Sequence, residues 1–357
     1  MTPATMARML PDGRRLGAHL PLGEGMVKAA DRAAEIGANA LQIFGDNPTA
    51  WKRRAAPAAE QAAFQARLAE LGIAPLVVHA SYLINLAGPD PDFFDRSIGL
   101  LAAELRDAPG LGARHVNVHI GSHRGSGLAI GIERLADGIV RTLERVAEGA
   151  EETGTGEPSQ PPKLLLENSS GGGWGLGVSV VELAQIAEAI DGRGVPRDRL
   201  GFCLDTAHAW GAGIDLSDPL TTDTLLEEFQ RRIGLDRLAV IHLNDSKSAL
   251  GSRMDRHEHV GAGQIGEVGM AHILRHPLLA HVAYILETPG MDEGYDAINV
   301  ARAVALARGE ALAPLPPGAM TLRGSRSRSA GLAAPDAADD VVDLDAAADQ
   351  TGSRVGR

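Results

Sequence analysis

Eight strand-like segments alternate along this chain with eight stretches of helical periodicity. The strand-like segments cover approximately residues 15–20, 40–45, 76–81, 115–120, 163–168, 200–206, 239–244 and 283–288. They are apolar almost throughout, which is typical of parallel strands that are covered by helices. This order predicts an α/β fold, namely a closed (β/α)8 TIM barrel. An open doubly wound sheet would show the same alternation, but His19-Leu-Pro-Leu-Gly stands where its glycine-rich phosphate loop would follow the first strand.

The barrel pattern covers residues 15–310 of the 357-residue chain, and the two flanks differ from it. Residues 1–14 are expected to form a flexible N-terminal extension. Residues 311–357 are rich in Ala, Pro, Gly, Ser, Arg and Asp and contain no aromatic residue. Such a segment cannot bury enough apolar surface to offset the entropy of ordering. We therefore expect a single TIM-barrel domain followed by a disordered tail.

The composition excludes several classes of protein. We expect a cytoplasmic protein with no membrane partner, because no run of about 20 apolar residues is present and the N-terminus lacks the apolar core of a secretory signal. The single cysteine, Cys203, rules out an internal disulfide and fits a reducing compartment. A formal net charge of −12 argues against a broad basic surface for nucleic acids. Bound divalent cations would nevertheless add positive charge where an anionic substrate approaches.

Six of the strand-like segments end in a residue that can bind a metal ion. These residues are His79, His119, Glu167, Asp205, His242 and Glu287. The C-terminal ends of the strands meet at one mouth of such a barrel, so the six side chains are expected to converge there. Three more candidate ligands follow in the loops, namely His208, Asp255 and His257.

Taken singly, each of these residues has an ordinary explanation. A histidine at a strand end is more often a hydrogen-bonded core or rim residue, and a carboxylate there can cap the next helix. Taken together they favour cations, because burying so many charges in one barrel mouth without them is costly. Five imidazoles and four carboxylates without thiolates suit two or three zinc-like ions, with manganese possible. Several closely spaced cations favour hydrolysis of a phosphodiester, whereas one cation with two acids would suffice for sugar isomerisation.

The chain resembles the endonuclease IV family of apurinic/apyrimidinic (AP) endonucleases from Gly17 to Pro289. The motifs that carry the resemblance are Ser81-Tyr-Leu-Ile-Asn-Leu86, Val118-His-Ile-Gly-Ser-His123, Leu166-Glu-Asn168, Cys203-Leu-Asp-Thr-Ala-His208, His242-Leu-Asn-Asp-Ser-Lys-Ser248, Gly251-Ser-Arg-Met-Asp-Arg-His257, Gly261-Ala-Gly-Gln-Ile-Gly266 and Leu286-Glu-Thr288. All nine ligand positions of the family's trinuclear zinc site carry the expected type of residue.

The resemblance implies how three zinc ions per chain would be shared. The first would be held by His79, His119 and Glu167, the second by Glu167, Asp205, His242 and Glu287, and the third by His208, Asp255 and His257. Glu167, as the bridging ligand, and Glu287, which would orient the attacking hydroxide, are the expected catalytic residues.

The resemblance also implies the reaction and the partner. The family cleaves double-stranded DNA on the 5′ side of an abasic site, leaving a 3′-hydroxyl and a 5′-deoxyribose phosphate, and it removes 3′ blocking groups. An abasic nucleotide can reach recessed metals readily, because it loses little stacking when it leaves the helix. We expect a monomer that works in base-excision repair.

Four residues are expected to contact DNA. Tyr82 and Leu83 match family residues that probe the gap left by the missing base, where an aromatic and an aliphatic wedge can replace lost stacking. Lys247 and Arg253 are expected phosphate contacts. The chain departs from the family pattern at Thr49, where the family commonly has an arginine that inserts into DNA.

Two alternative functions remain at this point. A sugar isomerase or epimerase on the same barrel would need one metal and would have no use for Asp255 and His257. A non-catalytic protein that only binds DNA lesions would be expected to lack ligands, and none is lacking.

Overall fold

The computed structural model describes residues 10–52, 57–152 and 161–322. Eight parallel strands form a closed barrel in the order β1-β10-β7-β6-β5-β4-β3-β2. The strands are β1 (Arg15–His19), β2 (Ala40–Phe44), β3 (Leu76–His79), β4 (His115–His119), β5 (Lys163–Glu167), β6 (Leu200–Asp205), β7 (Leu238–His242) and β10 (Ala283–Leu286). The predicted TIM barrel is confirmed.

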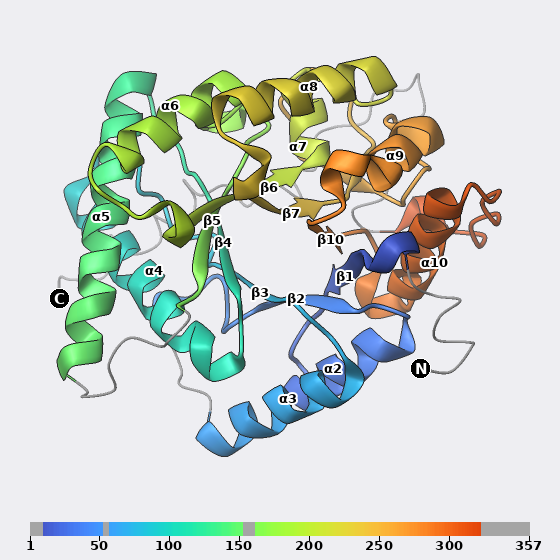
Figure 1. Cartoon of the computed structure of the whole chain (residues 1–357), viewed down its shortest axis with the longest axis horizontal. Coiled ribbons are helices and arrows are strands. Elements are labelled where there is room, and N and C mark those ends of the chain that lie inside the picture. The colour runs from blue at the N-terminus through green and yellow to red at the C-terminus, as the bar shows by residue number, and fades with distance from the viewer. Residues whose placement is uncertain (1–9, 53–56, 153–160, 323–357) are drawn as a thin grey trace, which may run out of the picture.

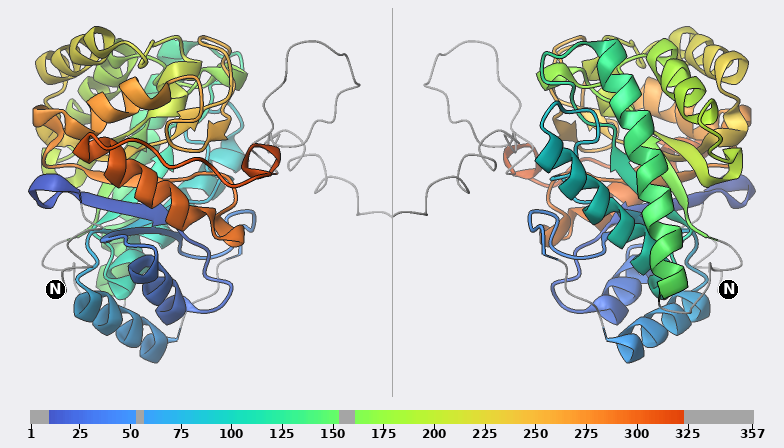
Figure 2. Two further views of the ribbon diagram at one scale, coloured as in Figure 1. Left: turned by 90° about the vertical axis from the view of Figure 1, so that its right-hand side faces the viewer. Right: turned by 90° about the vertical axis from the view of Figure 1, so that its left-hand side faces the viewer.

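Helices surround the barrel (Figure 1). They are α2 (Met26–Glu35), α3 (Ala58–Leu71), α4 (Pro91–Leu111), α5 (Leu128–Glu152), α6 (Val180–Asp191), α7 (Thr206–Gly211), α8 (Pro219–Arg232), α9 (Gly266–Arg275) and α10 (Tyr295–Arg308). The longest two, α4 and α5, pack side by side along one flank (Figure 2). Short helix α7 follows β6 directly, where Asp205 accepts a hydrogen bond from the His208 backbone N–H and so caps the helix.

Side chains of the strands alternate between two environments because successive residues of a strand point to opposite faces. Outward-pointing residues such as Val78 and Leu166 join the large core beneath the helices. A second, small core lies inside the barrel. It consists of Ala40, Val77, Leu165, Cys203, Val240 and Ile285. The residue two positions further along each of these six strands points inward as well, one layer closer to the mouth.

Some residues outside the predicted limits of 15–310 also pack on the barrel. Arg14 is buried and donates to the carbonyl of Leu274 at 2.6 Å. Of the predicted tail, residues 311–322 are described, and Ala319 is 1% exposed and accepts a hydrogen bond from His259. Residues 1–9 and 323–357, which hold the rest of the predicted extension and tail, lie outside the described residues. No helix in the described part of the chain is both long enough and apolar enough to span a membrane.

Candidate metal centre

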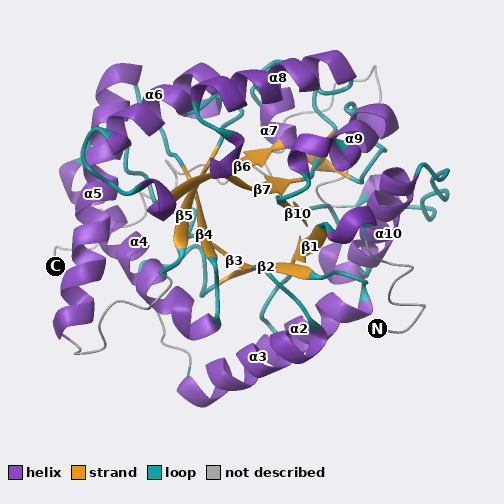
Figure 3. Ribbon diagram, in the orientation of Figure 1, coloured by secondary structure: helices purple, strands orange, loops and turns teal. Residues whose placement is uncertain are grey.

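The inward layer at the mouth holds the strand-end ligands predicted from sequence. His79, His119, Glu167, Asp205 and His242 are the last residues of their strands, and Glu287 directly follows β10. Neighbouring strands bring ligands side by side, since His119 pairs in register with Glu167, and Asp205 with His242. Figure 3 shows these strands meeting at the centre of the helical ring.

All nine predicted ligands lie together in three adjoining groups. Within each of the following groups, the ligand atoms lie within 4.8 Å of one another. The groups are His79 with His119 and Glu167, Asp205 with His242 and Glu287, and Asp205 with His208 and His257. Asp255 joins the last group, because its carboxylate oxygens lie 3.1 Å from His208 Nε2 and 2.9 Å from His257 Nε2. Glu167 connects the first two groups through His242, whose Nδ1 is 3.4 Å from Glu167 Oε1.

Three of the histidines are held in one tautomer by backbone carbonyls. In each, Nδ1 donates to a carbonyl oxygen: His79 to Ala80 at 2.8 Å, His208 to Asn168 at 2.9 Å and His257 to Glu287 at 2.7 Å. A carbonyl oxygen can only accept, so the proton of the neutral ring is on Nδ1. Nε2 is then left with a lone pair, and in all three rings it faces a carboxylate. This arrangement of donor and lone pair is that of metal-binding imidazoles.

His242 is held in the opposite tautomer, with the ring proton on Nε2. Its Nε2 lies 2.9 Å from the side-chain oxygen of Gln42, and its Nδ1 has no hydrogen-bond partner although the atom is fully buried. Glu287, Glu167 and Asp205 each place an oxygen 3.2 to 3.8 Å from this nitrogen. A lone pair that faces three carboxylates is repelled by them unless a cation or proton lies between. The residues present therefore fit bound divalent cations with nitrogen and oxygen ligands.

The carboxylates are oriented by neighbouring side chains, of which Asn117, Asn244 and Gln42 were not singled out from the sequence. Asn117 donates to Glu167 at 2.5 Å, and Asn244 donates to Asp205 at 2.7 Å. Gln42 Nε2 donates to Glu287 Oε1 at 2.7 Å, and His19 Nδ1 lies 3.3 Å from the same oxygen. The strand pattern could have indicated Gln42. It stands two positions after Ala40, which points into the barrel, just as His79 stands two positions after Val77.

Electrostatic forces between the protein groups are strong. Burial lowers the pKa of His257, but Asp255 and Asp205 outweigh it and raise the pKa to about 10. Burial opposes ionisation of Glu167, yet His242 and His119 hold the pKa of its carboxyl well below the usual range. The carboxylates thus attract a proton strongly onto His257, whereas burial lowers the pKa of His119 to about 4, and bound cations would replace the protons held at the site.

A second cluster of similar composition serves as an internal comparison. Asp223 on α8 accepts from Nε2 of His272 at 2.6 Å and of His276 at 3.1 Å. Nδ1 of His276 accepts from the Leu278 backbone N–H at 3.3 Å, which places the ring proton on Nε2. This Nε2 has no lone pair to offer to a metal ion, so the cluster links α8 to α9 by hydrogen bonds. At the barrel mouth, by contrast, ring nitrogens with lone pairs face the carboxylates.

The predicted DNA contacts lie in different environments. Tyr82 is half-buried, with its ring 5.8 Å from that of His79 and 5.9 Å from that of His119. Leu83 is 5% exposed and belongs to the main core, so its predicted role as a wedge does not fit this conformation. Arg253 is exposed and Lys247 half-buried. Thr49 is exposed and donates to Asn47 through its hydroxyl.

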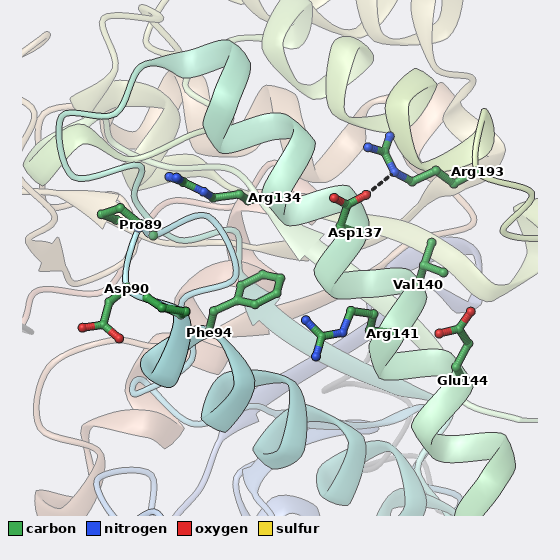
Figure 4. A pocket seen from close by; sticks show the side chains of 11 residues that line it. Pro89, Asp90, Phe94, Arg134, Asp137, Val140, Arg141, Glu144 and Arg193 are labelled. Atoms are coloured by element: carbon green, nitrogen blue, oxygen red, sulfur yellow. Dashed lines mark hydrogen bonds and ion pairs between the residues drawn. The ribbon is translucent and has the colours of Figure 1, made fainter.

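A cavity of about 530 Å³ lies away from the ligands, between α4 and α5 (Figure 4). Arg134, Arg141 and Arg193 line it. Two of these guanidinium groups form ion pairs, Arg193 with Asp137 and Glu133 and Arg141 with Asp95. None of the nine candidate ligands lines this cavity.

Comparisons with known proteins place the chain in a family. The model for xylose isomerase-like TIM barrels matches residues 30–308. A probable endonuclease 4 of Halothermothrix orenii is 41% identical over 291 residues, which are 81% of this chain and 99% of the relative. The chain belongs to the endonuclease IV family. A probable endonuclease 4 of Methanoculleus marisnigri is 39% identical and is covered to 98% of its length, with 82% of this chain matched.

Solved structures agree with the membership in the endonuclease IV family. The crystal structure of endonuclease IV from Thermus thermophilus is 36% identical with a TM-score of 0.69, covering 83% of this chain and all of that chain. A D-tagatose 3-epimerase-like protein is 18% identical with a TM-score of 0.56, over 83% of this chain and 97% of that chain. At that identity the likeness concerns the barrel fold alone.

Proposed function

We propose that this chain is a zinc-dependent AP endonuclease of base-excision repair, which hydrolyses the phosphodiester on the 5′ side of an abasic site in double-stranded DNA. The products would be a 3′-hydroxyl and a 5′-deoxyribose phosphate, and the same site would remove 3′ blocking groups. The proposal includes action as a monomer in the cytoplasm. Its main support is the buried Nδ1 of His242, which faces three carboxylates and so suits a bound cation.

The nine ligands suit three ions, with zinc favoured by the imidazole-rich donor set and manganese a second candidate. The first ion would be held by His79, His119 and Glu167, the second by Glu167, Asp205, His242 and Glu287, and the third by His208, Asp255 and His257. When bound, such cations neutralise phosphate charge and lower the pKa of water.

Glu287 would orient the attacking hydroxide. Burial raises its pKa, but His242 and His19 outweigh burial and keep the pKa below its usual range. The group is therefore ionised at neutral pH and can accept a hydrogen bond from a nucleophile. Gln42 and His19 contact Oε1, which leaves Oε2 directed towards His242 Nδ1.

DNA would reach this centre across the loops after the strands. Arg253 is exposed beside the third group of ligands and suits a phosphate contact, as does Lys247. Tyr82, whose ring lies close to the rings of His79 and His119, would lie against the abasic nucleotide.

Cleavage of a defined duplex tests the proposal. Zinc-loaded protein should nick a duplex that carries a tetrahydrofuran abasic analogue, and the product should be extended by a DNA polymerase without further treatment. The undamaged duplex is the substrate control. Failure of the loaded protein to nick the analogue would falsify the proposal.

Two variants test the assignment of Glu287. Glu287→Gln should retain DNA binding and lose about 100-fold or more in kcat, because an uncharged amide orients the attacking hydroxide less strongly than the carboxylate does. Glu188→Gln on the exposed face of α6 is the matched control and should cut at the normal rate.

A sugar epimerase is the second candidate, since the fold is shared with such enzymes. It would need neither Asp255 nor His257, whereas both carry close contacts in the third group of ligands. Turnover of a ketose such as tagatose by the loaded protein, without nicking, would favour it.

A further inference from the structure

Trp174 is an exposed aromatic residue on the rim of the barrel mouth. Its side chain is 64% exposed, the largest exposed fraction of an aromatic residue in the described part of the chain. The other two tryptophans are packed, Trp210 at 6% exposure and Trp51 against Phe93. Exposed indole rings are enriched at binding surfaces, because they offer a large rigid apolar face at little cost in entropy.

The loop that carries Trp174 is held firmly by the neighbouring loop. Ser122 and Gly175 form an isolated β-bridge, and the His123 backbone N–H donates to the Trp174 carbonyl at 3.1 Å. The His123 ring lies 5.5 Å from the indole. Trp174 itself has φ +64°, a left-handed conformation that side-chain-bearing residues rarely adopt. Such strain is kept where the surroundings impose it, and it often marks functional positions.

The loop lies next to the third group of ligands. It follows Glu167, the last residue of β5, and Gly172 is so close to the next segment that a Cβ there would come within 2.9 Å of the Arg253 carbonyl oxygen. Arg253 is exposed and lies two positions before Asp255. The indole thus lies on the same rim as the guanidinium group of Arg253 and the candidate metal centre.

We propose that Trp174 stacks on a nucleobase next to the lesion when DNA lies across the mouth. The inference rests on the proposed function and adds a recognition residue to it. Stacking on an aromatic ring tolerates any base, since every base has a π face, and this suits an enzyme that must act at lesions in any sequence. The neighbouring Arg253 would contact the phosphate of the stacked nucleotide and fix the direction of the strand.

Kinetics of three variants on the tetrahydrofuran duplex test the inference. Trp174→Ala should raise KM by about 5- to 100-fold with kcat nearly unchanged, because stacking adds affinity and takes no part in the chemistry. Trp174→Phe, which keeps an aromatic face, should recover most of the loss. Leu278→Ala removes a 47%-exposed apolar side chain before β10 and is the matched control.

Fluorescence gives a second readout that does not depend on turnover. Binding of the duplex should quench the tryptophan emission of the natural chain, and Trp174→Phe should lose most of that quenching. An unchanged KM in Trp174→Ala, or quenching that persists in Trp174→Phe, overturns the inference. The inference is also overturned if Trp174→Phe folds but binds the duplex as weakly as Trp174→Ala. If the natural chain itself fails to nick the duplex, the proposed function fails instead.

Discussion

The Nε2 of His242 lies 2.9 Å from Oε1 of Gln42, and this contact determines which nitrogen of the ring faces the candidate metal centre. An amide oxygen only accepts, so Nε2 carries the proton and Nδ1 presents its lone pair to Glu167, Asp205 and Glu287. The same amide donates to Glu287 through Nε2. One side chain therefore orients both a nitrogen and an oxygen ligand.

Gln42→Ala should weaken metal binding. Loss of a group that orients metal ligands typically costs about 10- to 100-fold in metal affinity or activity, and Gln42 orients two ligands at once. Zinc content after dialysis against a competing chelator, measured by atomic absorption, checks this. Gln65→Ala, an exposed glutamine on α3, is the control and should keep its zinc. Full zinc retention in Gln42→Ala would contradict the role assigned to Gln42.

Removal of metal should destabilise the fold. Ions that bind only the folded state add stability by mass action, and about 3 kcal/mol is gained at a concentration 100 times Kd. For a barrel of this size, chelation should lower Tm by about 5 °C or more, and zinc should restore it. His242→Ala removes one ligand of the second ion only, so differential scanning calorimetry of this variant should show a smaller shift than the natural chain. His272→Ala, which alters the hydrogen-bonded cluster on α9, should show the full shift.

Asp245 should make stability depend on pH. Burial raises the pKa of its carboxyl from 3.8 to about 6, against the effect of hydrogen bonds from Gly263, Ser246, Ile265 and Gly266. The folded state then binds more protons than the unfolded state between these two pH values, so stability falls as pH rises through this window and levels off above it.

Urea unfolding of the natural chain and of Asp245→Asn, both with chelator present, isolates this contribution. The difference in unfolding free energy, natural chain minus variant, should fall by about 2 kcal/mol between pH 4 and pH 6.5. A difference that is constant with pH would show that Asp245 is not the titrating group.

Cys203 should be unreactive in the folded protein. Its side chain is 1% exposed inside the barrel, and burial raises the pKa of the thiol to about 12. The thiolate is the reacting form, so labelling by a disulfide reagent at pH 8 should be at least about 100-fold slower than in urea, where one thiol per chain should react. Labelling at equal rates in both conditions would rule out the buried position.

Much of the fold could be predicted from sequence because strands and helices leave local patterns. The apolar segments predicted at 76–81 and 163–168 contain β3 and β5, and each predicted strand overlaps one strand of the barrel. The strand-end ligands could be predicted for a geometric reason. Parallel strands of a closed barrel end at the same mouth, so residues far apart in the chain, such as His79 and Glu287, must approach one another.

Other features depend on contacts that leave no local pattern. Leu83 follows a ligand strand as a surface wedge would, yet it packs into the main core at 5% exposure. Trp174 lies in a glycine-rich loop whose shape is set by Ser122 and His123, residues about fifty positions earlier. Neither outcome follows from the residue and its sequence neighbours.

The sequence by itself determined the barrel, the nine side chains at its mouth and, through its motifs, the endonuclease IV family. Only the tertiary structure decided which nitrogen of each histidine faces the centre and that Gln42 orients His242 and Glu287. The physical reason is that ligand identity and strand period are local properties of the chain. The direction of a hydrogen bond across the barrel is decided only when the barrel closes and brings Gln42 of β2 within reach of His242 and Glu287 at the ends of β7 and β10.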